Sequence, residues 1–235
     1  MSELLYEGKA KQVYSTDDKE VYLIHFKDDA TAGNGAKHDV FANKGVLNNT
    51  ISTIIYGMLE ENGIKTHLIS KVNDRDILVK KVEILPLEVI VRNVLAGSIC
   101  ARLGLEEGRV LEEPIFELCW KNDEYHDPMI NEDHAVLALN AATREEVAYL
   151  KDQTLKINEL LKKFFLEIGL KLVDFKIEFG KTSDGQIILA DEISPDTCRL
   201  WDVKTNAKFD KDVFRRDMGN LIDTYNEVLN RLNRR

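Results

Sequence analysis

Two carboxylates on a predicted β-hairpin offer the clearest chemistry in the sequence. Apolar and polar residues alternate from 173 to 179, the pattern of a strand with one apolar face. Asp184-Gly185 is typical of a two-residue type I′ turn, and with that turn Glu178 lies opposite Asp191. Opposed carboxylates at roughly 5 Å repel each other, and Mg²⁺ removes that repulsion while also binding nucleotide phosphates. The hairpin therefore predicts a magnesium site.

Asp174 and Lys176 share the predicted outer face with Glu178, so one strand presents an acid and an amine beside the metal pair. A second interpretation remains open, in which this face of the hairpin is merely solvated. A three- or four-residue turn would shift the register and remove Asp191 from its place opposite Glu178.

A glycine-lysine turn near the start of the chain is a candidate phosphate site. Residues 4–26 are typical of antiparallel strands, and the first turn reads EGKAK, with Gly8, Lys9 and Lys11. Glycine lets backbone amides approach a phosphate, and lysines supply point charges. Such turns are also common on protein surfaces, so this pattern alone does not decide the function.

Two separated arginines are candidates for a second anion site. A buried strand at 89–91 delivers Arg92, and Ser98 opens a short helix. A helix N-terminus and an arginine together favour phosphate, although Arg92 capping a neighbouring strand is an equal alternative. Arg199 follows in a polar loop at 194–202.

The chain divides most naturally at Pro86, into an N-terminal domain of residues 1–85 and a C-terminal domain of residues 86–235. A segment joining two sheet domains suits a flat adenine ring. We expect a helix near 46–59 that ends at Asn62-Gly63, a long polar loop at 28–39, and a single last helix from about Asp210.

A capping box formed by Thr143 and Glu146 predicts the start of a long helix that Gly169 ends. This helix feeds directly into the strand that carries Glu178, so we expect it to act as scaffold.

Composition limits the class of protein. The chain has 235 residues and a formal net charge of −9, which argues against broad binding to nucleic acid or to anionic membranes. No stretch approaches 18 apolar residues. The three cysteines are odd in number and far apart, which suits a reducing compartment, and we expect a cytoplasmic protein.

Together with the candidate metal and phosphate sites, this composition indicates a nucleotide-dependent phosphoryl-transfer enzyme. A small-molecule kinase and a non-catalytic nucleotide-binding module are the alternatives.

Five motifs extend this interpretation. YEGKAKQVY, VIVRNVLAGS, KNDEYHDPMIN, LVDFKIEFG and LADEISPDTCRLWD occur in this order over nearly the full chain. Together they closely resemble the phosphoribosylaminoimidazole-succinocarboxamide synthase (SAICAR synthetase) family. The resemblance implies a two-domain α+β fold related to ATP-grasp and kinase-like architectures, with antiparallel sheets, flanking helices and a cleft between the domains. It also implies a homodimer that uses ATP and Mg²⁺ to join L-aspartate to carboxyaminoimidazole ribotide.

The resemblance further implies roles for individual residues. ATP contacts would come from Gly8, Lys9, Ala10, Lys11, Val13, Lys80, Glu83, Leu85, Glu178 and Asp191. The last two would also hold Mg²⁺, and catalysis would involve Lys11, Asp174 and Lys176. Substrate contacts would come from Arg92, Ser98, His126, Asp127, Asp196 and Arg199. One departure concerns Gly33-Asn34-Gly35, where some relatives are expected to carry aspartate; Asn34 lacks that charge, so we assign this loop no metal role.

Overall fold

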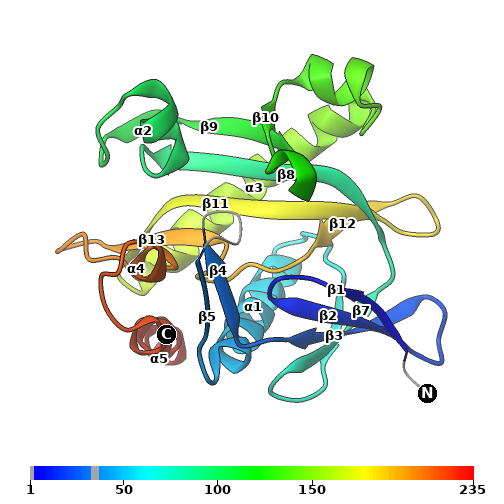
Figure 1. Ribbon diagram of the computed structural model, residues 1–235, viewed down its shortest axis with the longest axis horizontal. Coiled ribbons are helices and arrows are strands. Elements are labelled where there is room, and N and C mark those ends of the chain that lie inside the picture. Colours follow the sequence, from blue (N-terminus) through cyan, green and yellow to red (C-terminus); the bar gives the residue numbers. More distant parts are fainter. Residues whose placement is uncertain (1–2, 33–36) are drawn as a thin grey trace.

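The computed structural model describes residues 3–32 and 37–235, and its strands form two main sheets (Figure 1). The five-stranded sheet has the order β1-β2-β3-β7-β6. Its strands are β1 (Leu4–Glu7), β2 (Lys11–Ser15), β3 (Val21–Phe26), β6 (Leu68–Lys71) and β7 (Asp76–Lys80). A separate hairpin joins β4 (Asp29–Ala32) to β5 (Lys37–Val40). The Gly33-Asn34-Gly35 loop lies outside the described residues.

The larger, six-stranded sheet has the order β10-β9-β8-β11-β12, with β13 also paired to β11. Its strands are β8 (Glu83–Val94), β9 (Val110–Trp120), β10 (Met129–Ile130), β11 (Leu170–Lys181), β12 (Ile187–Ala190) and β13 (Cys198–Asp202). The strand pairs of both main sheets are antiparallel, which confirms the predicted α+β class.

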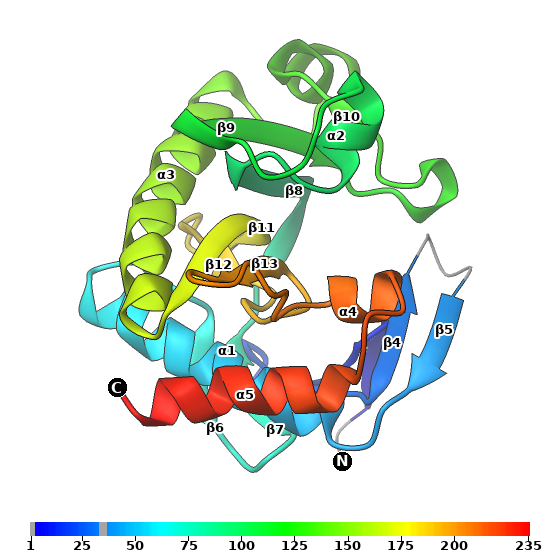
Figure 2. The same cartoon turned by 90° about the vertical axis from the view of Figure 1, so that its left-hand side faces the viewer.

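The helices are α1 (Lys44–Glu61), α2 (Ser98–Leu103), α3 (Arg144–Glu167), α4 (Asp212–Arg215) and α5 (Leu221–Asn233), with short turns of 3₁₀ helix at Asp123–Tyr125 and π-helix at His134–Ala138. Figure 2 shows α3 beside the larger sheet and α5 running alongside α1. Among residues 3–32 and 37–235, no helix has both the length and the apolar character needed to span a membrane.

The main core lies where α1 and α3 meet the larger sheet. Three of the four apolar residues of β11 predicted to alternate, Phe175, Ile177 and Phe179, are buried there. The fourth, Val173, lies at a register shift of β11 and is buried in a separate cluster with Val94, Ala96 and Trp201. The capping box of Thr143 and Glu146 is present at the start of α3, as predicted. Helix α1 ends at Asn62, also as predicted. Since α1 packs into this core, the helix connects the N-terminal part of the chain to the larger sheet. The division at residues 85 and 86 stays a prediction, and Pro86 lies inside β8.

Four sequence predictions were wrong in detail. Arg199, expected in a polar loop at 194–202, lies in strand β13, which pairs with β11. The expected loop at 28–39 contains the paired strands β4 and β5. The predicted single last helix is two helices, because the chain turns between them through Asp217 and Gly219, both at positive φ. Asn220 then caps α5 by accepting from two backbone amides.

The predicted hairpin register is also wrong. The turn between β11 and β12 spans 183–185, three residues rather than two, and Gly185 alone of these has positive φ. A type I′ turn would need Asp184 there as well. The extra residue shifts the ladder by one position, so Glu178 lies opposite Ala190.

Candidate active site

Strand β11 presents three charged side chains in a row on the face opposite the apolar core. Asp174, Lys176 and Glu178 alternate with core residues, as the period of two predicts. From Asp174 to Glu178 the backbone advances about 13 Å, at roughly 3.3 Å per residue. The strand therefore separates two charged clusters, one at each end of this row.

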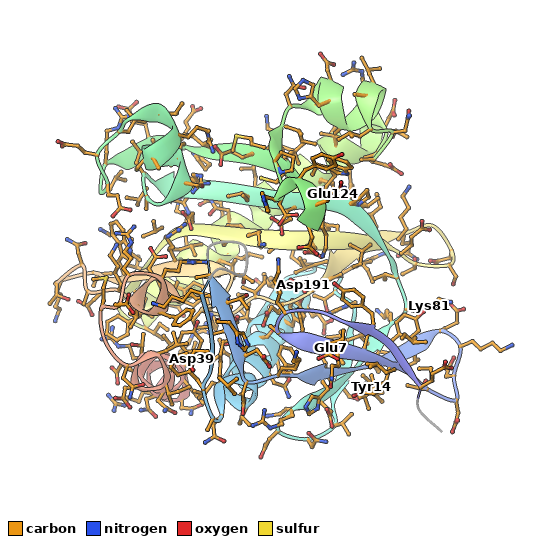
Figure 3. All side chains as sticks on the ribbon, viewed as in Figure 1. Glu7, Tyr14, Asp39, Lys81, Glu124 and Asp191 are labelled. Atoms are coloured by element: carbon orange, nitrogen blue, oxygen red, sulfur yellow. The ribbon has the colours of Figure 1, made fainter. Side chains whose placement is uncertain are left out.

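The first cluster contains the predicted metal pair. Although Asp191 is not opposite Glu178 in the ladder, it follows β12 directly and has a left-handed backbone, with φ 64°. Its carboxylate accepts a hydrogen bond from Lys11. Burial raises the pKa of Glu178, and the negative charge of Asp191 raises it further. The two predicted ligands are therefore neighbours, but the turn at Asp191 brings them together and not direct pairing across the hairpin. Figure 3 shows Asp191 between the larger sheet and the strands of the smaller one.

Lysines from both sheets neutralise these acids. Lys121, at the end of β9, donates to both carboxylate oxygens of Glu178 at 2.6 Å. Lys11, from β2, lies 3.6 Å from Glu192 as well as bonding Asp191. Burial lowers the pKa of Lys11, but the two acids outweigh it and the net direction is upward. For Asp191, burial raises the pKa and Lys11 outweighs that effect, so its pKa is lowered.

This cluster has one negative charge more than it has positive charges. Among residues 3–32 and 37–235, two ammonium groups face three carboxylates, and Oε2 of the buried Glu192 has no hydrogen-bond partner. Within the part of the chain that the structure describes, no group of three or more His, Cys, Asp or Glu side chains has the geometry to hold a metal alone. Two carboxylates fit the way proteins hold Mg²⁺, in which phosphates and water complete the coordination.

Lys176 lies at the middle of the row, where its amine bonds Glu88 of β8 at 2.5 Å. Burial lowers the pKa of Lys176, but Glu88, Glu178 and Asp191 together raise it above its ordinary value. Lys176 is therefore held as a cation between the two clusters.

The second cluster surrounds Asp174. Its carboxylate accepts from Arg92 at 3.0 Å and from Arg199 at 3.0 and 3.1 Å. Burial raises the pKa of Asp174, and the two arginines oppose this effect without cancelling it. Arg92 is only 2% exposed and also bonds Glu117 and the hydroxyl of Ser98. The structure thus brings the three predicted phosphate ligands together.

Arg199 is the more accessible arginine of this cluster, and Gly97 lies directly against its guanidinium. A side chain on Gly97 would meet that group, and its φ of 65° also favours glycine. Asp212 of α4 binds the Nε of Arg199 at 2.9 Å and fixes its orientation.

The predicted nucleotide residues of the smaller sheet lie along β1, β2 and the strand β7. The amide of Gly8 closes the β1–β2 turn on Lys11 O, and Ala10 O accepts from Lys27 N. Val13 packs against the core of the smaller sheet. Lys9 reaches across to Asp123, at 2.8 Å.

The remaining predicted site residues belong to the proposed adenine segment and to the loop after β9. Lys80 ends β7 with its amine 3.4 Å from Thr66 O, Glu83 is exposed, and Leu85 is in the main core. His126 and Asp127 both have positive φ on the loop after β9.

Asp196, a predicted substrate contact, has a buried carboxylate that pairs with side chains of the protein. It accepts from Lys44 at 2.6 Å and from the hydroxyl of Tyr225, and Lys211 lies 3.6 Å away. Burial raises the pKa of Asp196, and Lys44 and Lys211 lower it more strongly, so the net direction is downward. Each carboxylate oxygen of Asp196 therefore already accepts a hydrogen bond from another side chain of the protein.

Sequence reasoning missed five residues of these clusters: Glu88, Glu117, Lys121, Glu192 and Asp212. Glu117 lies in no motif that we quoted, and it accepts from Arg92 across the sheet. Lys121 and Glu192 lie inside motifs that we quoted, so their neighbours gave a signal. Glu88 and Asp212 had none, because their roles depend on pairing across the sheet and on the position of α4.

The mixed α+β fold and its two clusters of charged side chains fit an enzyme of phosphoryl transfer. The family model for SAICAR synthetase matches residues 4–232, so the chain belongs to the SAICAR synthetase family. A phosphoribosylaminoimidazole-succinocarboxamide synthase from Finegoldia magna is 65% identical over 98% of this chain and 99% of its own. One from Fusobacterium nucleatum is 60% identical, covering 97% of this chain and 96% of its own.

Solved structures agree. The synthase from Ehrlichia chaffeensis has a TM-score of 0.95 and 46% identity, covering 98% of both chains. A SAICAR synthetase in complex with ADP has a TM-score of 0.94 and 50% identity, covering 98% of this chain and 97% of its own. The activity of the protein is therefore SAICAR synthesis, an ATP-dependent ligation in purine biosynthesis.

Proposed function

We propose that the protein joins L-aspartate to the carboxylate of carboxyaminoimidazole ribotide through an acyl phosphate, with the two clusters of β11 holding opposite ends of the ribotide. The observation that carries this proposal is the row Asp174, Lys176 and Glu178. Arg199, with Ser98 and Arg92 behind it, receives the ribotide phosphate at one end. The ribotide carboxylate then lies toward Glu178 and the ATP phosphates at the other.

Lys9 and Lys11 of the β1–β2 turn hold the ATP phosphates in this proposal, and Lys80, Glu83 and Leu85 contribute to the nucleotide site. Glu178 and Asp191 hold Mg²⁺, which neutralises phosphate charge when bound. The surplus negative charge of the cluster and the carboxylate donors support a divalent cation here.

The chemistry proceeds in two steps. An oxygen of the ribotide carboxylate attacks the γ-phosphorus of ATP, the bond to the β-phosphate oxygen breaks, and ADP leaves. The neutral amine of L-aspartate then attacks the acyl carbon and forms the C–N bond. Phosphate departs with the electron pair of the broken C–O bond and takes up the proton that the nitrogen releases. Lys176 lies where both steps meet and, as a fixed cation, stabilises the developing negative charge.

His126 and Asp127 are proposed as further substrate contacts from the loop that Lys121 anchors. A homodimer and a cytoplasmic location follow from the family resemblance, and light scattering on the purified protein tests the first.

Rapid-quench measurement of ADP tests the order of the two steps. With Mg-ATP and the ribotide but no aspartate, we expect up to one ADP per active site, followed by full turnover when aspartate is added. Absence of any ADP until aspartate is present would overturn the acyl-phosphate step while leaving the ligase activity untouched.

A further inference from the structure

Asp191 has a backbone conformation that aspartate adopts at a cost. Its φ of 64° lies in the left-handed region, which residues other than glycine adopt infrequently. Such residues persist only where surrounding contacts hold them. The turn also decides the direction of the carboxylate, because Asp191 has just left the ladder of β12 and is no longer paired with β11.

Helix α1 supplies contacts on both sides of this turn. The hydroxyl of the fully buried Tyr56 donates to the carbonyl of Ala190 at 2.9 Å. The hydroxyl of Ser52, one helical turn earlier, accepts from the amide of Ile193 at 3.2 Å. The backbone is therefore held immediately before Asp191 and two residues after it.

The same helix face continues to Lys44, which lies two turns before Ser52 and bonds Asp196 at 2.6 Å. On the other side, Leu189 exchanges backbone hydrogen bonds with the 65–67 segment, at 3.0 and 2.8 Å. The segment from Leu189 to Asp196 is thus held by parts of the chain that precede β8, although its strand belongs to the larger sheet.

We propose that Tyr56 and Ser52 are positioning residues that hold Asp191 in its left-handed conformation and so direct its carboxylate toward Lys11 and the metal. The inference rests on the proposed metal role of Asp191. Neither Tyr56 nor Ser52 is proposed to bind the metal, because their hydroxyls contact only the backbone on either side of Asp191. Without the Tyr56 hydroxyl the buried carbonyl of Ala190 loses its side-chain partner, and the turn relaxes.

The test uses Mn²⁺ as the metal probe and measures its dissociation constant by electron paramagnetic resonance at saturating ADP. We expect Tyr56→Phe and Ser52→Ala to weaken Mn²⁺ binding about tenfold or more, as loss of the hydrogen bonds that orient a metal ligand does in other metal sites. Tyr149→Phe is the matched control, since its hydroxyl also bonds a carbonyl of β12, that of Ile187, at 3.1 Å. It should leave Mn²⁺ binding unchanged.

A double-mutant cycle separates this inference from the metal assignment. Asp191→Asn alone must weaken Mn²⁺ binding; if it does not, the proposed metal site fails. If Asp191→Asn weakens binding, Tyr56→Phe should add nothing to it. Additive effects, or an unchanged dissociation constant in Tyr56→Phe, would show that Tyr56 does not act through Asp191. Thermal unfolding of each variant, measured in parallel, reports any loss of stability separately from metal binding.

Discussion

The amine of Lys121 lies 2.6 Å from each carboxylate oxygen of Glu178. Glu178 is buried, whereas the side chain of Lys121 is 41% exposed. An ammonium at equal distance from both oxygens neutralises a carboxylate that burial would otherwise destabilise. Because Lys121 is partly exposed, it can give up this pairing if the proposed divalent cation neutralises Glu178 instead.

Replacing Lys121 therefore weakens the metal-free protein first. In Lys121→Met, Glu178 keeps its burial and loses its partner. We expect the melting temperature without ligands to fall by about 3–6 °C, and Mg²⁺ with ADP to recover most of the loss. Differential scanning calorimetry measures both. Lys156→Met removes an exposed pair with Asp152 and serves as the control. An equal loss with and without Mg-ADP would contradict the proposed exchange of charges.

Glu178 itself is predicted to be needed for turnover. Glu178→Gln keeps the shape of the side chain and removes the charge that we propose binds Mg²⁺, so we expect turnover to fall roughly tenfold or more with the fold intact. ADP release in the presence of all substrates measures the turnover, and circular dichroism checks the fold. Glu159→Gln, on the exposed face of α3, is the matched substitution. Near-normal activity in Glu178→Gln would remove the metal assignment.

Arg199 is predicted to act on the ribotide and not on ATP. Its guanidinium bonds both Asp174 and Asp212, a geometry that lysine does not reproduce. In Arg199→Lys we expect KM for the ribotide to rise about tenfold and KM for ATP to change by less than about twofold. Steady-state kinetics with each substrate varied in turn gives both constants. Parallel increases in the two constants would count against a phosphate-specific role. Arg144→Lys, at an exposed pair, is the control.

Asp210 makes stability depend on pH near neutrality. Burial, followed by the charge of Asp212, raises the pKa of Asp210 from 3.8 to about 7. The native state therefore binds a proton that the unfolded chain has released, and the free energy of unfolding falls as pH rises from about 4 to about 7. Asp210→Asn removes this proton from both states.

The comparison of wild type with Asp210→Asn isolates that effect from other groups, such as His67, whose pKa burial lowers to about 4. Between about pH 5.5 and pH 7.5, we expect the wild type to lose about 1–2 kcal/mol relative to the variant. Urea unfolding at both pH values measures the difference. A difference that does not change with pH would refute the raised pKa. The variant should be less stable overall, because the carboxylate accepts from the amides of Leu200 and Asp212.

The elements that local pattern determines were predictable from the sequence. The period of two along β11, the capping box of α3 and the end of α1 at Asn62 each depend on residues close together in the chain. The register of the hairpin was not predictable, because Asp184-Gly185 fits both a two-residue turn and the observed three-residue turn. Only packing of the strands selects between them.

The site residues divide in the same way, into those that local sequence identifies and those that only the packing of the chain brings together. Motif residues such as Lys11, Glu178 and Arg199 were identified from the sequence. In the structure they belong to the two charged clusters at the ends of the Asp174–Glu178 row of β11. Their partners were harder to find: Lys121 is 57 positions from Glu178, and nothing in the local sequence indicates that pairing. The residues around Asp196 in the sequence are mostly polar, so the sequence did not indicate that Lys44 and Tyr225 bind its carboxylate inside the protein.

The pairing of Lys44 with Asp196 also bears on the order in which the chain can fold. Lys44 is completely buried, and its partner lies 152 positions later. Tyr225, which closes the same carboxylate, comes later still. During synthesis an early α1 cannot bury this charge until the segment carrying Asp196 has left the ribosome. Complete packing of α1 therefore requires the C-terminal half of the chain. In a nascent chain stopped before Asp196, α1 stays accessible to chaperones and proteases.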